Sequence, residues 1–399
     1  MKYAFADRVR KLQPSAVRDM LKVVGQGNVI SFAGGLPDDD LFPIEGIEDS
    51  FSRVFATGKH SLQYGATEGY LPLRETILKR MKKKGITGLD TDQVLVTTGS
   101  QQAIDLFSRI MLNPGDVVLT EDPTYLAALQ VFNFYEANVV AVECDENGMI
   151  AEDLERKLEQ YKPKFVYVVP TFSNPTGYVW SLERRKMLLD LVEKHNVIVL
   201  EDDPYGEIQF EQEETYTPLL ALDGGERVIY TSTFSKIAVP GLRTGWVAGP
   251  EKLISTMAQA KQANDLHSDS ISQQALYQLS AHFDLDGHIE NIVSVYKNRM
   301  EIMVNCLEQS GLKDVRFVKP KGGMFLWVEV SDSIDTVALF PEAVEKGVAF
   351  VPGEQFFAGT PKKNTMRLNF THPTPEEIER GMKILADLLA SKTVKIGSR

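Results

Sequence analysis

The chain has 399 residues, of which 43% are apolar and 25% are charged, as in ordinary globular proteins. The formal net charge of −12 argues against nucleic acid or an anionic membrane as the main partner, although a local basic pocket can still bind a small anion. The two cysteines, Cys144 and Cys306, lack the spacing of a zinc site, so we expect neither a bound metal nor a disulfide framework.

The N-terminus contains no apolar run of signal-peptide length, and no run in the chain is long enough to span a bilayer. We therefore expect a cytoplasmic protein. The length exceeds that of one usual domain and favours two.

The first motifs lie near the N-terminus. Residues 1–27 are predicted to be helical, and Arg18 lies off the apolar face of that helix. Arg18 is either a solvated charge or a residue that reaches a ligand. The segment Phe32-Ala33-Gly34-Gly35-Leu36-Pro37 follows, and its paired glycines either allow close approach of a ligand or simply make a turn.

Two further segments are candidate ligand contacts. Tyr64 lies in a polar loop with glycines, before a helix predicted over residues 71–83, and by composition this loop is a plain connector. Gly99-Ser100-Gln101 comes between a predicted strand, 94–98, and a helix. Free N–H groups at a helix start bind anions, but a serine there is also a common N-cap.

Three predicted strands end in polar or aromatic residues. Tyr125 follows strand 117–120 and either stacks on a planar ring or is half-buried packing. Asn174-Pro175-Thr176-Gly177 follows strand 165–170 and has the composition of a turn. Asp202-Asp203-Pro204-Tyr205 follows strand 197–200. A carboxylate there is either solvated or pairs with a protonated ring nitrogen.

The segment from Thr231 to Trp246 contains Ser235, Lys236 and Arg243 and follows the apolar run 228–230. Hydroxyls and a cation at a strand end suit an anion such as phosphate. A sheltered lysine can lose its proton and attack carbonyls. The alternative is a surface turn with incidental serine and lysine.

Arg367 lies in a short alternating strand, Met366–Phe370, and points opposite to its apolar neighbours. It is either a surface cation or a planar bidentate clamp for a carboxylate. The apolar strands, separated by helical patterns, predict a parallel sheet covered on both faces. The polar residues then lie at the carboxyl ends of its strands, where open α/β sheets bind ligands.

These motifs, in this order, resemble the class I/II aminotransferases, which are fold type I enzymes dependent on pyridoxal 5′-phosphate. The resemblance covers about residues 14–390. The Phe-Ala-Gly-Gly-Leu-Pro segment resembles the subgroup that acts on 2-aminoadipate, kynurenine and aromatic amino acids. The resemblance to the family implies an α/β fold. In this fold a large domain has a mostly parallel seven-stranded sheet between helices, and a second, smaller domain is also α/β. We expect an N-terminal segment (1–45) contributing to the small domain and to substrate entry, a large cofactor-binding domain (46–290) and a small C-terminal domain (291–399).

The resemblance also implies the roles of the residues. Lys236 forms the Schiff base with the cofactor, Asp202 contacts the ring nitrogen and Tyr125 stacks on the ring; these three are the catalytic set. Tyr64 reaches the cofactor of a neighbouring subunit, which implies a homodimer with composite sites. The expected cofactor-binding residues are Ser100, Gln101, Tyr125, Asn174, Asp202, Tyr205, Thr233, Ser235, Lys236, Arg243 and Tyr64. The expected substrate-binding residues are Arg367, Asn174, Gly35 and Arg18.

The implied reaction is ping-pong transfer of an amino group, through the Lys236 aldimine, from an aromatic, 2-aminoadipate-like or branched-chain amino acid to 2-oxoglutarate. The alternatives are another reaction on the same scaffold, such as a C–S lyase or a decarboxylase, a non-enzymatic transcription regulator, or an inactive homologue. The similarity begins within about fifteen residues of Met1, so we expect no winged-helix domain before it. The presence of both Lys236 and Arg367 argues against an inactive homologue.

Overall fold

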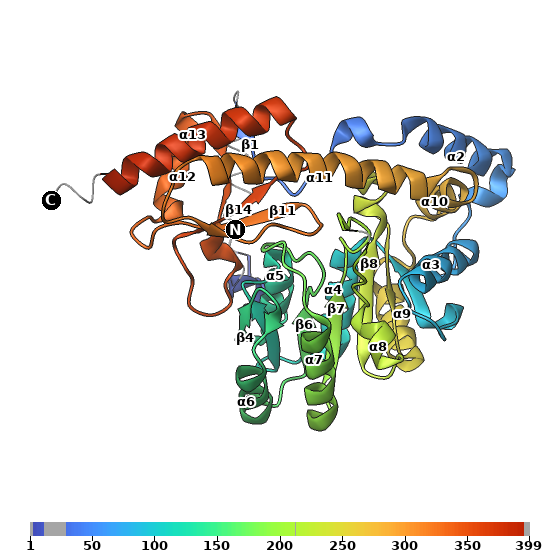
Figure 1. Cartoon of the computed structure of the whole chain (residues 1–399). Coiled ribbons are helices and arrows are strands. Elements are labelled where there is room, and N and C mark those ends of the chain that lie inside the picture. Colours follow the sequence, from blue (N-terminus) through green and yellow to red (C-terminus); the bar gives the residue numbers. More distant parts are fainter. Residues whose placement is uncertain (1–2, 12–28, 212, 395–399) are drawn as a thin grey trace.

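The computed structural model describes residues 3–11, 29–211 and 213–394 (Figure 1). Of the helix predicted over residues 1–27, the described part is a short 3₁₀ helix, η1 (Asp7–Lys11). Arg18 lies outside the described residues. Among the residues that are described, no helix is both long and apolar enough to cross a membrane.

A large sheet forms the centre of the molecule, with the strand order β2-β9-β8-β7-β6-β3-β4-β5. Strand β9 is antiparallel to both of its neighbours, β5 is a two-residue strand antiparallel to β4, and the other pairs are parallel. The prediction of a mostly parallel sheet is confirmed, with β5 as a short eighth strand beside seven longer ones. The bounds are β2 (Val94–Thr97), β3 (Val117–Asp122), β4 (Asn138–Asp145), β5 (Gly148–Met149), β6 (Phe165–Val168), β7 (Ile198–Asp202), β8 (Val228–Thr233) and β9 (Gly245–Ala248).

The central strands are apolar throughout because both faces of the sheet are covered. Successive side chains alternate between two cores: Val166 and Val199 belong to one, and Tyr167 and Leu200 to the other. The first core includes side chains of α3 (Leu71–Lys83), α6 (Ala151–Tyr161), α7 (Leu182–His195) and α8 (Leu219–Asp223). The second includes those of α4 (Ser100–Met111), α5 (Leu126–Phe134) and α9 (Glu251–Asp265).

Strand β4 was not predicted from the sequence. Its segment Val139–Val142 is apolar, but its flanks carry Asn138, Glu143 and Asp145. The strand lies near the edge of the sheet, and most of its residues are only partly buried. A partly covered strand has no need of the continuous apolar pattern that marks the central ones.

A smaller antiparallel sheet, with the order β10-β11-β14-β13, lies beside the large one. Its strands are β10 (Arg316–Phe317), β11 (Phe325–Glu329), β13 (Val351–Pro352) and β14 (Thr365–Asn369). Strand β1 (Ile30–Ser31) pairs with β12 (Val348–Ala349), which joins the N-terminal segment to this region. Its helices are α12 (Thr336–Glu345) and α13 (Pro375–Val394). The turn predicted at Val351–Gly353 is β13 followed by a 3₁₀ helix.

The long helix α11 (Leu285–Gln309) runs from the side of α2 (Ile44–Ala56) and α10 (Ser270–His282) to the side of the small sheet (Figure 1). The boundary predicted at residue 290 falls within this continuous helix. The division into 1–45, 46–290 and 291–399 stays a prediction.

Candidate active site

A cavity of about 310 Å³ lies where the carboxyl ends of the central strands meet the small sheet. Most of the residues that the sequence singled out line it, although they come from segments far apart in the chain. The lining residues are Gly35, Ser100, Gln101, Tyr125, Val169, Asn174, Asp202, Pro204, Tyr205, Thr233, Ser235, Lys236, Pro240, Arg243, Phe325 and Arg367.

Lys236 ends a 3₁₀ turn, Phe234–Lys236, that follows β8 directly. Its Nζ donates a hydrogen bond of 2.8 Å to the carbonyl of Gly35. Burial, and then the nearby charges of Arg367 and Arg243, lower the pKa of the Lys236 amine to about 8. A substantial fraction of this amine is therefore neutral near physiological pH and can act as a nucleophile or as a base.

An anion cradle lies at one end of the cavity. Gly99 is the N-cap of α4 with φ 76°, a left-handed conformation that suits glycine, and Ser100 is the first residue of the helix. Ser100 Oγ is buried and has no hydrogen-bond partner. Arg243 Nη1 donates to Ser235 Oγ at 3.1 Å, and Thr233 Oγ1 donates to the same oxygen at 2.8 Å. Free amides, three hydroxyls and one guanidinium thus converge on a space for a tetrahedral anion.

Asp202, the last residue of β7, also lines the cavity. Its Oδ2 accepts a hydrogen bond of 2.9 Å from Tyr167 Oη, but its Oδ1 is buried without a partner. Burial, with Asp203 and Glu121 nearby, raises the pKa of Asp202 to about 7, although the Tyr167 hydrogen bond opposes this. A buried acceptor with no donor is costly, so a ligand N–H is the partner that this oxygen lacks.

Aromatic and amide groups also line the cavity. Tyr125 Oη donates to Gln101 Oε1 at 3.4 Å, and burial raises the Tyr125 pKa to about 12, so this phenol stays neutral. Tyr205 is buried, and its ring meets that of Phe325 edge to face at 5.8 Å. Asn174 also lines the cavity, and aromatic side chains such as these can stack on a planar ring.

Arg367, in the centre of β14, is buried on the side of the small sheet. Its Nη1 donates to Asn174 Oδ1 at 2.7 Å, and its Nη2 donates to the carbonyl of Ala33 at 2.8 Å. The guanidinium lies 4.3 Å from the ring centre of Phe325 and 5.1 Å from that of Phe356. Burial lowers the Arg367 pKa to about 10, so the group remains cationic, and its Nε has no partner. Arg367 is therefore a buried cation of the cavity and not a surface cation, and a planar guanidinium of this kind suits a carboxylate ligand.

Of the singled-out residues that the structure describes, Tyr64 does not line the cavity. Tyr64 has 79% of its surface exposed, and its ring meets that of His267 edge to face at 5.8 Å. A role in a neighbouring subunit's site stays a prediction. Arg18 lies outside the described residues, so its role at the substrate stays a prediction as well.

Sequence reasoning missed Tyr167, Phe325 and Phe356. Tyr167 was included in an apolar strand, yet a hydroxyl in a strand that is buried on both faces needs a partner. Tyr167 is paired in register with Leu200, so it lies on the same face as Asp202, two residues further along the neighbouring strand. Phe325 and Phe356 have no comparable signal because their contact with Arg367 depends on tertiary packing.

Comparison with known proteins agrees with this geometry. The model of the family described as aminotransferase class I and II matches residues 28–385. This chain belongs to the class I and II aminotransferases. Such aminotransferases are enzymes that use pyridoxal 5′-phosphate. The prediction of a cofactor-dependent enzyme is confirmed.

Several aminotransferases resemble the chain over nearly its whole length. The aromatic-amino-acid aminotransferase 1 of Thermococcus litoralis is 41% identical, covering 98% of this chain and 95% of the relative. The kynurenine aminotransferase of Pyrococcus horikoshii has a solved structure with a TM-score of 0.93 and 43% identity, covering 97% of each chain. LysN, the α-aminoadipate aminotransferase of Thermus thermophilus, was solved with N-(5′-phosphopyridoxyl)-L-leucine; its TM-score is 0.90 at 35% identity, with 98% of each chain covered.

The residues present in this aminotransferase fit pyridoxal 5′-phosphate. Asp202 Oδ1 and Ser100 Oγ both lack a partner in this cavity, and the cofactor offers a ring N–H that could donate to the first and a phosphate that could accept from the second. Glycine suits position 99, because its φ is 76° and a Cβ there would lie 2.7 Å from Arg243 Nη2, so that the guanidinium would have to shift. Two unsatisfied polar atoms in one cavity are explained by a single ligand.

Proposed function

We propose that this enzyme transfers the amino group of an aromatic, 2-aminoadipate-like or branched-chain amino acid to 2-oxoglutarate. The observation that supports the cofactor-dependent chemistry best is the unpartnered Asp202 Oδ1 in the same cavity as the buried amine of Lys236. The proposed donor class rests on the names of the relatives, which include aromatic amino acid, 2-aminoadipate and kynurenine aminotransferases.

The chain's own residues would hold the cofactor in one orientation. The cradle of Ser100, Gln101, Thr233, Ser235 and Arg243 would bind its phosphate. Asp202 would accept a hydrogen bond from the ring nitrogen, and Tyr167 would orient Asp202 for this task. Tyr125 would stack on the ring, while Asn174 and Tyr205 would donate to the phenolic oxygen.

Bound in this cavity, pyridoxal 5′-phosphate supplies an electron sink that stabilises negative charge at the substrate Cα. Lys236 Nζ would hold the cofactor covalently at rest, then take the proton from the substrate Cα as a general base and deliver it again as an acid. Its pKa of about 8 suits both tasks, because neither the neutral nor the protonated form is scarce at neutral pH. Asp202, in its ionised form, would keep the ring nitrogen protonated.

Arg367 would bind the substrate α-carboxylate through two parallel hydrogen bonds. Phe325 and Phe356 pack against the guanidinium and limit its rotation, and Asn174 accepts from Nη1. Gly35 contributes its carbonyl to Lys236, and a Cβ at this position would lie 3.3 Å from Phe325 Cζ. The substrate would therefore lie between the segment around Gly35 and the ring of the cofactor.

Two further proposals concern Tyr64, which would act in the site of a second subunit, and Arg18, which lies outside the described residues. Tyr64 would reach the cofactor phosphate of a second subunit, so the active unit would be a homodimer. Its exposed phenol is available for such a contact. Arg18 would approach the substrate side chain, and its interaction with acidic donors such as 2-aminoadipate would widen the range of substrates.

The visible absorption spectrum of the purified enzyme tests these proposals together. We expect a yellow band that shifts towards the near-ultraviolet on addition of phenylalanine, leucine or 2-aminoadipate and returns with 2-oxoglutarate, with ping-pong initial rates. Lys236→Ala should lower turnover by about 10⁴-fold, whereas Lys252→Ala on the surface is the matched control. A response to alanine or aspartate alone would contradict the donor class, and release of pyruvate with ammonia, or of carbon dioxide, would contradict the reaction.

A further inference from the structure

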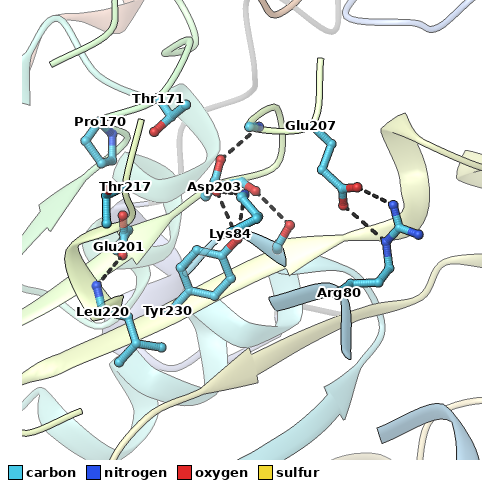
Figure 2. Close-up of polar contacts among 12 residues, drawn as sticks. Arg80, Lys84, Pro170, Thr171, Glu201, Asp203, Glu207, Thr217, Leu220 and Tyr230 are labelled. Atoms are coloured by element: carbon cyan, nitrogen blue, oxygen red, sulfur yellow. Dashed lines mark hydrogen bonds and ion pairs between the residues drawn. The ribbon is translucent and has the colours of Figure 1, made fainter. Parts of the chain in front are cut away.

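Asp203 follows Asp202 directly but does not line the cavity, and its side chain is almost completely buried. Its Oδ2 accepts hydrogen bonds from Lys84 Nζ and, at 2.9 Å, from Tyr230 Oη. Its Oδ1 accepts from the backbone N–H of Gly206 at 2.9 Å. Figure 2 shows Asp203 with Lys84 and Tyr230 gathered around it. Both carboxylate oxygens of Asp203 are therefore satisfied within the protein.

Lys84 comes from a distant part of the chain, immediately after α3, and brings the positive charge that Asp203 needs. Only 17% of its side chain is exposed. Its Nζ also lies 3.0 Å from Tyr230 Oη and 5.5 Å from the centre of the Tyr230 ring. Within the described residues, Lys84 is the basic side chain that forms a salt bridge with Asp203. A buried carboxylate left without such a partner is strongly unfavourable.

The contacts of Asp203 close the turn Asp203–Gly206, which carries two lining residues, Pro204 and Tyr205. The packing inside this turn leaves no spare room. A Cβ at Gly206 would lie 2.5 Å from Asp203 Oδ1 and 2.6 Å from Lys84 Nζ. The ammonium group is thus packed against the backbone of the turn at Gly206, the residue that follows Tyr205, and its removal would leave a gap there.

The turn is also linked to the substrate side of the cavity. After Tyr205 the chain forms backbone hydrogen bonds with the segment that enters β11: Gly323 N donates to Ile208 O at 2.8 Å, and Phe210 N donates to Lys321 O at 2.9 Å. That segment leads into Phe325, whose ring packs against Arg367. A shift of the turn would therefore reach both walls of the cavity.

We propose that Lys84 is a positioning residue of this aminotransferase: paired with Asp203 and Tyr230 outside the cavity, it fixes the turn that presents Tyr205 to the cofactor. Lys84 touches neither cofactor nor substrate and acts through the turn. The inference rests on the proposed roles of Asp202 and Tyr205 in cofactor binding.

The test compares Lys84→Met with Lys83→Met. The neighbouring Lys83 also forms a salt bridge, with Asp286, but 59% of its side chain is exposed. Pyridoxal 5′-phosphate is titrated into the cofactor-free protein, the visible circular dichroism of the bound cofactor is recorded, and amide exchange is followed for peptides covering residues 203–209. We expect Lys84→Met to bind the cofactor about tenfold more weakly, with a smaller dichroic band and faster exchange in this segment. Lys83→Met should match the wild type.

A purely structural role for Lys84 would lower the melting temperature and leave cofactor affinity and dichroism unchanged, and that result would overturn the proposal. If Lys84→Met does not fold, the double variant Lys84→Met/Asp203→Asn carries the test, because it removes the uncompensated charge but keeps an acceptor for the Gly206 N–H. Reduced cofactor affinity in the double variant supports the proposal, and wild-type affinity overturns it.

Asp202→Asn and Tyr205→Phe separate this inference from the proposed function. If both variants bind the cofactor with wild-type affinity, the proposed cofactor site is wrong, and the proposed role of Lys84, which depends on that site, is wrong too. If both are impaired and Lys84→Met is not, the role of Lys84 alone is wrong.

Discussion

Two adjacent aspartates at the end of β7 differ in how their carboxylates are satisfied. Asp202 lines the cavity and keeps one oxygen without a partner, whereas Asp203 lies outside it and has partners for both oxygens. Both are buried and carry the same chemical group. At this pair, the incomplete hydrogen-bond shell belongs to the residue that lines the cavity and can meet a ligand, and the complete shell belongs to the residue that holds the backbone of the turn in place.

Exchanging each aspartate for asparagine tests this comparison, and these two variants should show the largest changes in kcat and in the free energy of unfolding. Asp202→Asn should lower kcat by about 10³-fold, because the ring nitrogen loses its anionic partner. Its free energy of unfolding without cofactor should not fall by more than about 1 kcal/mol, because the amide oxygen can still accept from Tyr167 and the other carboxylate oxygen has no partner to lose. Asp203→Asn should instead lower the free energy of unfolding by about 2–3 kcal/mol, because Lys84 loses its counter-ion.

Steady-state kinetics and urea unfolding of the cofactor-free proteins measure these two effects separately. If Asp203→Asn reduced kcat as strongly as Asp202→Asn without loss of stability, the two aspartates would share one role and the comparison would be broken.

The pH dependence of cofactor binding tests a second ionisable group that lines the cavity, the amine of Lys236. The pKa of Lys236 is lowered to about 8, and only the neutral amine attacks the cofactor aldehyde. The amine is protonated below this pKa, so the association rate of cofactor with the cofactor-free enzyme should rise about tenfold per pH unit between pH 6 and 8 and level off above it. Stopped-flow absorbance from pH 6 to pH 10 measures this rate. A rise that continued to pH 10 would mean that the amine keeps its ordinary pKa.

Arg367→Lys tests the second cation of the cavity. Lysine retains the charge but loses the planar pair of donors, so we expect KM for the amino acid donor to increase by about 30-fold, with cofactor affinity unchanged. Arg316→Lys is a suitable control, because Arg316 forms an exposed salt bridge with Glu329 on the same small sheet. Loss of cofactor affinity in Arg367→Lys would place Arg367 at the cofactor and not at the substrate.

Tyr167→Phe should produce the smallest effect. It removes one neutral donor to Asp202 Oδ2 without changing the charge of the cavity. We expect kcat to fall by about fivefold, equivalent to about 1 kcal/mol. Because this hydrogen bond lowers the pKa of Asp202, the acid limb of the kcat profile should also move to higher pH. An unmoved acid limb would show that Tyr167 only fills space.

The residues that the sequence predicted best are those that follow a buried strand. Asp202, Lys236 and Asn174 each come after an apolar run, and strand ends in a parallel sheet meet at one edge, so their convergence could be expected. The helix predicted over residues 71–83 is α3 with the same bounds. Local pattern is sufficient where the position of a residue in its own element decides where its side chain lies.

The residues that could not be predicted depend on contacts between distant segments. Lys84 lies after a helix among other lysines, and nothing near it in the sequence distinguishes it from Lys82 or Lys83. Only the fold, which brings it to a residue 119 positions away, reveals its role. Phe325 became a neighbour of Arg367 in the same way, through the packing of the small sheet against the cavity.

The residues that line the cavity come from separate stretches of the chain, so evolution can change one stretch and leave another unchanged. All the lining residues that we assign to the cofactor fall between Ser100 and Arg243, whereas Gly35, Phe325 and Arg367 come from outside that stretch. Mutations near the N-terminus or in the small sheet can therefore alter which amino acid is accepted while the machinery for the cofactor is inherited intact. A lineage of such enzymes can diversify its substrates without having to reinvent its chemistry.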